Sequence, residues 1–150
     1  MDQLKYDINY FFSNTDEVKK IDNTYNGEYK DITVKEKYEK YPKIKYPMIT
    51  ISEISNEDVE QFYDGTEEVS YLAYQFEINC EQSIDKTAIQ NVTYIAKLLD
   101  GYMKNSKYSC MRRIGDLAKE PLDSDNNIII GFMRYECNLA IKTNTIYRRY

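Results

Sequence analysis

The 150-residue sequence has no histidine and no tryptophan, and it contains only five glycines and three prolines. The lack of histidine excludes Ser-His-Asp and Cys-His catalysis, and it excludes zinc sites with imidazole ligands. No glycine falls in a GxGxxG pattern or in a phosphate-binding loop that ends in Gly-Lys-Ser/Thr. These absences argue against an enzyme, and we expect no catalytic residue, no cofactor and no metal ion. We therefore expect a binding or structural protein.

Long apolar runs and paired cysteines are also missing. No segment approaches the roughly 18 consecutive apolar residues of a membrane-spanning helix, so we expect no membrane partner. The first seven residues have neither a basic start nor an apolar stretch, unlike a secretory signal. Cys80, Cys110 and Cys137 are far apart and form no CxxC motif. This spacing predicts reduced, buried thiols in an intracellular protein.

Charged residues and tyrosine are what the sequence has in abundance. Apolar residues make up 42% of the chain and charged residues 30%, which is typical of a folded globular domain. The net charge of −5 argues against a nucleic-acid backbone as the main partner. The 16 tyrosines favour protein contacts instead, because tyrosine is enriched in interfaces.

Apolar periodicity predicts the main elements. Apolar residues recur every three or four positions over residues 3 to 13 and again over residues 85 to 104, which predicts a short and a long helix. Alternating residues predict strands over 47 to 54, over 69 to 80 and over 128 to 141, with a further strand near 108 to 114. The first two strands should form an antiparallel hairpin with a long connection.

The order of these elements predicts an α+β fold rather than one built from βαβ units. We expect a mainly antiparallel sheet with the long helix packed on one face and a short N-terminal helix. Residues 14 to 27 are polar, and residues 28 to 41 alternate only loosely, which predicts an exposed strand or an extended arm. The interpretation is one domain over residues 1 to 150, with residues 14 to 45 as a candidate system-specific arm.

One segment begins like a calcium-binding loop. Residues 123 to 127 read Asp-Ser-Asp-Asn-Asn, as at the start of an EF-hand loop. Ile128 stands where that loop needs glycine, and Arg134 stands where it needs a bidentate glutamate. We therefore expect a turn into the last strand rather than a metal site.

Opposite charges gather in two other parts of the chain. Residues 53 to 68 carry seven carboxylates and no lysine or arginine, whereas the chain ends in Tyr-Arg-Arg-Tyr. An acid/base catalytic pair in the acidic segment is a weaker alternative, because no pocket-forming pattern surrounds it. Contacts between acidic and basic groups across subunits or rings are favoured. The candidate interface residues are Glu57, Asp58, Glu60, Arg134, Tyr147, Arg148 and Arg149.

Several short segments carry a family resemblance through their order and spacing. They are Tyr46-Pro47 with the strand that follows, Tyr74-Gln75-Phe76-Glu77-Ile78, the long helix, Met111-Arg112, Arg134-Tyr135-Glu136 and Thr145-Ile146-Tyr147-Arg148. In this order they resemble the tail terminator, or tail-completion, proteins of long-tailed phages and of phage-tail-like particles from Gram-positive bacteria. The resemblance covers about two thirds of the chain, roughly residues 44 to 149.

The resemblance implies a non-catalytic α+β subunit that forms a ring, expected to be a hexamer. Such a ring caps the last ring of tube protein, ends tube growth and offers a surface for the neck or head. The implied partners are further copies of the chain, the tail tube protein, and a sheath, neck or connector protein. The implied location is a virion or a phage-tail-like particle that assembles in the bacterial cytoplasm. Another head–tail connector or neck protein is the nearest alternative, and a nucleic-acid-binding α+β module is a second.

Overall fold

The computed structural model describes residues 2–40, 45–56, 68–82, 87–122, 125–142 and 145–149. In these ranges the protein has three helices and six strands. In chain order the elements are α1 (Asp2–Ser13), α2 (Thr15–Lys19), β1 (Thr33–Glu36), β2 (Met48–Asn56), β3 (Glu68–Glu81), α3 (Ala88–Asn105), β4 (Arg112–Leu122), β5 (Asp125–Lys142) and β6 (Thr145–Arg149).

The strands form a single, mostly antiparallel sheet. Its order is β1-β2-β3-β5-β4, and β6 pairs with β5 beyond the end of β4. Only the short β1 runs parallel to its neighbour β2 among the described pairs. The predicted hairpin is confirmed, because β2 and β3 are antiparallel with Ile49 opposite Ile78 and Ile51 opposite Phe76. β3 pairs with β5 along the whole of its length.

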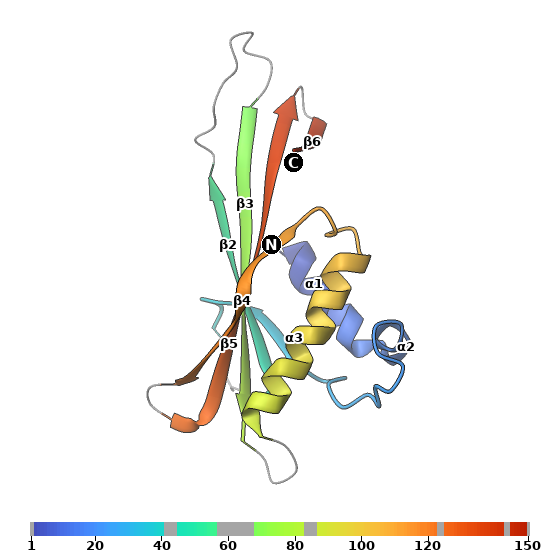
Figure 1. Ribbon diagram of the computed structural model, residues 1–150, viewed down its shortest axis with the longest axis vertical. Helices are drawn as coiled ribbons and strands as arrows, with labels where there is room; N and C mark the ends of the chain where they lie inside the picture. The colour runs from blue at the N-terminus through green and yellow to red at the C-terminus, as the bar shows by residue number, and fades with distance from the viewer. Residues whose placement is uncertain are drawn as a thin grey trace.

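The three helices lie on one side of this sheet (Figure 1). We call the covered side the inner face and the opposite side the outer face. α3 has 18 residues and packs against the inner face. The closest approach is at Gly131 on β5, where an added Cβ would lie 2.3 Å from Val92 Cγ1. A helix on one face of a mostly antiparallel sheet is therefore confirmed.

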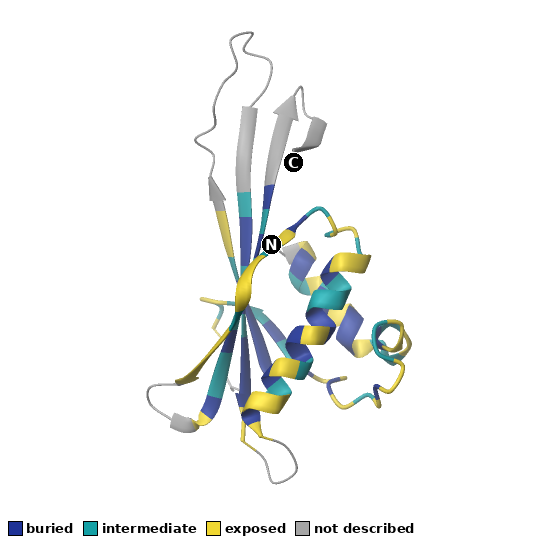
Figure 2. Ribbon diagram, viewed as in Figure 1, coloured by how far each residue is buried: buried dark blue, intermediate teal, exposed yellow. Residues whose placement is uncertain are grey.

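The core fills the space between the inner face and the helices, as the buried colouring of Figure 2 shows. From the sheet it receives the alternating residues of β2, β3 and β5, among them Phe76 and Tyr135. The rings of these two residues meet edge-on with their centroids 5.7 Å apart. From α1 it receives Leu4, Ile8 and Phe12, which follow the predicted helical spacing.

The start of α3 is set by local hydrogen bonds. The Thr87 hydroxyl accepts a hydrogen bond from the Gln90 backbone N–H, and the Gln90 side chain accepts one from the Thr87 N–H. This reciprocal pair satisfies two backbone donors that the first helical turn leaves without intrahelical partners. The helix then buries a stripe that includes Val92, Ile95 and Leu99.

Residues 28 to 41, predicted as an exposed strand or an extended arm, have both buried and exposed positions where they are described, and Tyr38 is 89% exposed. Tyr29, Ile32 and Val34 belong to the core, and only Thr33–Glu36 form a strand. The Tyr29 hydroxyl donates to Asn91 Oδ1 on α3 at 2.6 Å. A strand within this segment is confirmed. Three buried side chains hold the segment against the rest of the protein, so it is only partly exposed.

The fourth strand also differs from the prediction. β4 begins at Arg112 and runs through Pro121, whereas the sequence predicted a strand near 108 to 114. β4 has a bulge between Ile114 and Ala118, and Gly115 within it has a φ of 72°. The bulge breaks the alternation on which the sequence interpretation depends. Proline is tolerated at this position because β4 lies at a sheet edge.

Candidate interaction surface

The predicted interface residues are only partly described by the structure. Glu57, Asp58 and Glu60 lie outside the described residues. Tyr147, Arg148 and Arg149 lie on β6, where their backbones pair with Ala140, Leu139 and Asn138 of β5. The chain end is therefore tied into the sheet rather than a frayed tail.

The pairing register brings the two charged parts to one end of the sheet. The chain enters the acidic segment from Asn56 on β2 and returns from it at Glu68 on β3. Glu68 pairs with Ile141, which is next to the β5–β6 connection, and Asn56 pairs with Tyr71. The ends of the acidic segment and the basic β6 are thus close within one chain. Contacts within a subunit consequently compete with the predicted contacts between subunits.

Arg134 is the one predicted interface residue whose side chain is described. It lies on β5 between Gln75 of β3 and Ile114 of β4. Its Nε donates to Glu136 Oε1 at 3.1 Å, and both side chains are partly exposed. Arg134 therefore already has a carboxylate partner in its own chain, and any contact with another subunit has to include this pair.

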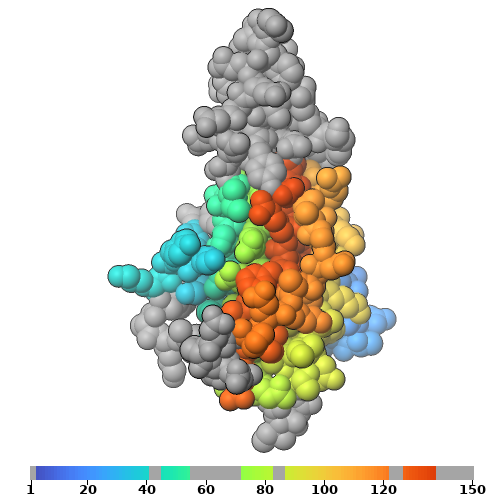
Figure 3. Space-filling model, turned by 60° about the vertical axis from the view of Figure 1, so that its left-hand side comes forward, coloured from blue at the N-terminus to red at the C-terminus, as the bar shows by residue number. Residues whose placement is uncertain are grey.

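The outer face extends across four neighbouring strands of the sheet. From β2 to β4, its rows are Ile54, Ala73, Glu136 and Arg112; Ser52, Gln75, Arg134 and Ile114; and Thr50, Glu77, Phe132 and Ala118. Figure 3 turns this side toward the viewer, and β2, β3, β5 and β4 contribute atoms to it. No described helix covers it (Figure 1).

Apolar side chains on the outer face are exposed to solvent. Ile54 is 40% exposed and Ile114 is 37% exposed, and Phe132 on the same face is half-buried. A solvated sheet face normally carries polar residues at these alternating positions. Polar groups on this face are paired internally: Glu77 accepts from Thr50 and forms an ion pair with Lys37 at 3.1 Å. The outer face is thus partly apolar, and two of its carboxylates, Glu77 and Glu136, have cationic partners in the same chain.

A second surface lies on α1, on the side away from the sheet. Its exposed positions, among those whose exposure is described, are Gln3, Tyr6, Asn9, Tyr10 and Ser13, and we call them the α1 strip. None of them is charged, although 30% of the chain is. Charged residues of α1 pair with groups in the same chain; Lys5, for example, forms an ion pair with Glu39 at 2.7 Å. The lack of charge at these positions was a signal in the sequence that periodicity alone did not reveal.

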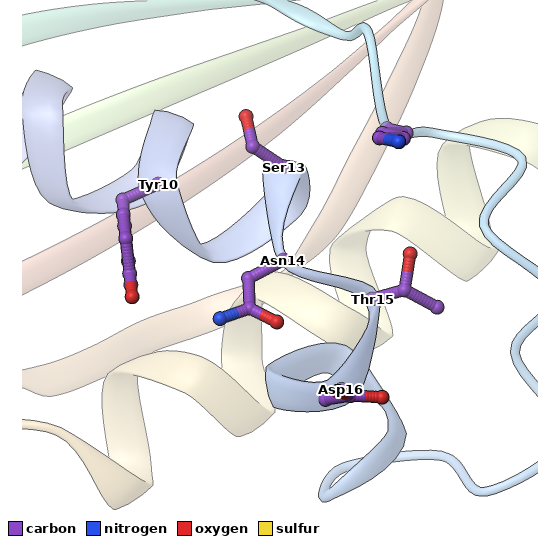
Figure 4. A pocket seen from close by; sticks show the side chains of 6 residues that line it. Tyr10, Ser13, Asn14, Thr15 and Asp16 are labelled. Carbon is purple, nitrogen blue, oxygen red and sulfur yellow. The ribbon is translucent and has the colours of Figure 1, made fainter.

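The α1 strip ends in a shallow open hollow at the corner between α1 and α2. Tyr10, Ser13, Asn14, Thr15, Asp16 and Lys30 line it. Figure 4 shows Tyr10, Ser13 and Asn14 at the end of α1, and Thr15 and Asp16 at the start of α2. The side chains supply hydroxyl, amide and carboxylate oxygens around the Tyr10 ring. The hollow can therefore receive a polar side chain from a neighbouring molecule.

Many tyrosines serve the fold instead of a surface. The hydroxyls of Tyr94, Tyr108 and Tyr135 donate to aspartate carboxylates at 2.6 to 2.8 Å. The pKa of Asp22, which accepts from Thr24 and from Tyr94, is lowered to about 2 by these hydrogen bonds. The high tyrosine content is therefore only in part a sign of interaction surfaces.

Reactive groups are sparse in the described part of the chain. No group of three acidic or cysteine side chains there could hold a metal ion. Cys80 and Cys137 are buried as predicted, and Cys110 is half-buried. Burial raises the pKa of the Cys80 thiol to about 12, so this thiol is protonated at neutral pH and is a poor nucleophile. Among the described helices, none has the length and apolar character needed to span a membrane.

The chain matches no protein-family model, and no curated protein matches it.

Proposed function

We propose that the protein is a structural subunit that forms a ring, caps the end of a phage-type tail tube and joins the tube to a neck or head. The observation that carries this proposal is the outer face, where Ile54 and Ile114 are exposed on a sheet with helices only on its other side. Such a face is typical of a surface that a protein partner covers. The resemblance of the sequence segments to tail terminators indicates the class of assembly.

Capping of this kind depends on shape. A tube grows because each ring of tube protein presents a surface that the next ring fits, so the series has no natural end. A ring that matches the tube on one side and presents a different surface on the other side ends the series. In the same way, the different surface can receive a neck or head component. The residues of this chain need only to make contacts in such a mechanism.

The test is to assemble the tail tube protein of the same particle with and without this protein. We expect tubes of uncontrolled length without it, and tubes that stop growing and carry a terminal ring when it is added. Electron microscopy measures the tube length and shows the ring. Unchanged length with no terminal density would overturn the proposal.

Two further measurements identify the alternatives. Native mass spectrometry that shows a ring other than a hexamer, together with unchanged tube length, would identify a connector. DNA or RNA affinity that falls steeply with salt in a filter-binding titration would identify a nucleic-acid-binding module. Either result would replace the terminator assignment.

A further inference from the structure

We infer that the α1 strip of one copy packs against the outer face of the next copy, so that the ring is built head to tail. This inference rests on the proposed ring and names the two surfaces that would form it. Four of the six exposed large hydrophobic side chains in the described residues lie on these surfaces: Tyr6, Tyr10, Ile54 and Ile114. Only Tyr38 and Ile89 lie elsewhere.

The α1 strip has the composition of an interface. Tyr6 and Tyr10 are 66% and 57% exposed, one helical turn apart, and lie opposite the buried Leu4 and Ile8. The polar side of a solvated helix normally carries charged residues, whereas every described position on this side is uncharged. The centre of a protein interface is depleted in charge and enriched in tyrosine. The composition of the α1 strip is therefore typical of a surface that is shielded from water in the assembled protein.

The outer face offers matching chemistry. Ile54 and Ile114 supply apolar area, and Arg112 and Arg134 supply guanidinium groups on the same side of the sheet. A guanidinium stacks favourably on a tyrosine ring while it keeps an in-plane bond to a carboxylate. The Arg134–Glu136 pair can therefore stay intact beneath a tyrosine of the next copy. The hollow next to Tyr10 can accommodate a longer side chain from the rim of that surface.

The position of the two surfaces determines the kind of assembly. The α1 strip consists of the exposed positions of α1, and Figure 1 shows α1 on the inner side of the sheet, opposite the outer face. A contact between two different surfaces on opposite sides of a subunit is heterologous, so it repeats and closes into a ring if the rotation per step allows. A contact of either surface with itself would give only a dimer.

The size of the contact predicts weak association outside the ring. α1 has 12 residues, so it is about 18 Å long and about 10 Å wide. A strip of this size buries a few hundred Å² per copy, below the roughly 800 Å² per partner of a stable complex. The association of two isolated copies is therefore weak. A closed ring is more stable because each subunit makes the contact twice.

The test places one cysteine on each surface and uses a short bismaleimide on the protein alone. Tyr10→Cys and Ile114→Cys are made in separate chains that carry Cys110→Ser, because Cys80 and Cys137 are buried. We expect the mixture to give a dimer with one chain of each kind, about tenfold faster than a mixture of Tyr10→Cys with Ile89→Cys, because docking raises the local thiol concentration. Both cysteines in one chain should give a ladder that ends at the ring.

Other outcomes would overturn the inference. A rate equal to that of the Ile89→Cys control would show that the surfaces do not meet. A faster product from Tyr10→Cys alone would show that α1 contacts itself. Tyr6→Glu, added to the Tyr10→Cys chain, tests the same contact by charge: the cross-linking rate with Ile114→Cys should fall to that of the Ile89→Cys control while the circular dichroism spectrum stays unchanged.

This experiment contains no tube protein, so it is independent of the capping assay. Normal capping without specific cross-linking would leave the proposed function standing and reject the head-to-tail contact. Specific cross-linking without an effect on tube length would support the head-to-tail contact and reject the proposed function.

Discussion

Tyr135 and Asp100 form a partly buried polar contact between the sheet and α3. The Tyr135 hydroxyl donates to Asp100 Oδ1 at 2.6 Å, and Lys104 contributes an ion pair to the same carboxylate at 3.0 Å. Tyr135→Phe removes the hydroxyl and leaves a largely buried carboxylate with one partner fewer. We expect the free energy of unfolding in urea to fall by about 1–3 kcal/mol. Tyr6→Phe, at an exposed position, is the matched control, and an equal loss in both variants would contradict the expectation.

Acid stability should depend on three aspartates. The pKa of Asp22 is lowered to about 2 by hydrogen bonds from Thr24 and Tyr94. Burial acts to raise the pKa values of Asp7 and Asp100, but hydrogen bonds from tyrosine and lysine outweigh it and lower them. Since the folded pKa values lie below the unfolded value near 3.9, this stabilisation is complete above about pH 4 and is lost as the pH falls through the folded pKa values.

The measurement is the urea midpoint as a function of pH. The midpoint should fall between about pH 4 and about pH 2 in the wild-type protein, since protonation of these carboxylates weakens their hydrogen bonds. Asp22→Asn should reduce the slope in this range. Asp31→Asn changes an exposed carboxyl elsewhere and serves as the control. The assignment of the slope to Asp22 fails if both variants keep the wild-type profile.

At the scale of the elements, the packing of α3 on the sheet depends on a missing side chain. An added Cβ at Gly131 would lie 2.3 Å from Val92 Cγ1 and 3.3 Å from Leu117 Cδ1. Gly131→Ala should therefore lower the free energy of unfolding by about 1–3 kcal/mol through overpacking. Val92→Ala removes the obstructing methyl, so the double variant should be more stable than the sum of the single effects predicts. Strictly additive effects in urea unfolding would show that α3 does not approach the sheet at this point.

Elements with strong periodicity were predictable from the sequence. α1, β2, β3 and α3 lie close to their predicted positions because each has one face in the core, which imposes a repeat of 3.6 or 2 residues. α2 was missed because a single anchor, Val18, holds it without a repeat. Within the segment predicted as a strand or an arm over residues 28 to 41, only Thr33–Glu36 form a strand. β4 was misplaced because its bulge changes the register.

At the scale of the whole molecule, the surfaces were harder to predict than the elements. Charge patterning indicated the acidic segment and the basic chain end as interface candidates. The strand register brings the two ends of the acidic segment close to the basic β6 within one chain. The outer face depends on the order of four strands that are distant in the sequence, so no local pattern reveals it. For the same reason, the exposure of Ile114 became evident only when β4 was placed at the edge of the sheet.

The predicted role of the acidic segment in assembly follows from this arrangement. Glu57→Gln, Asp58→Asn and Glu60→Gln remove three of its seven carboxylates, and we expect the isolated protein to fold as before. If these groups meet Arg148 and Arg149 of another subunit, the assembled particle should lose length control, since a ring repeats each weak contact. Asp31→Asn, Glu81→Gln and Asp116→Asn change the net charge equally at other exposed sites and form the control.

Electron microscopy of assembled tubes, with native mass spectrometry of the free protein, separates the two possible roles of the acidic segment. Uncontrolled tube length in the acidic variant, with normal length in its charge-matched control, supports a contact between subunits. The variant with Arg148→Gln and Arg149→Gln should then give the same defect. Because β6 pairs with β5 next to the anchors of the acidic segment, a contact within one chain would instead lower the stability of both isolated variants. Wild-type length and assembly in both variants would show that these charges are merely solvated, and the ring would then depend on uncharged surfaces such as the α1 strip.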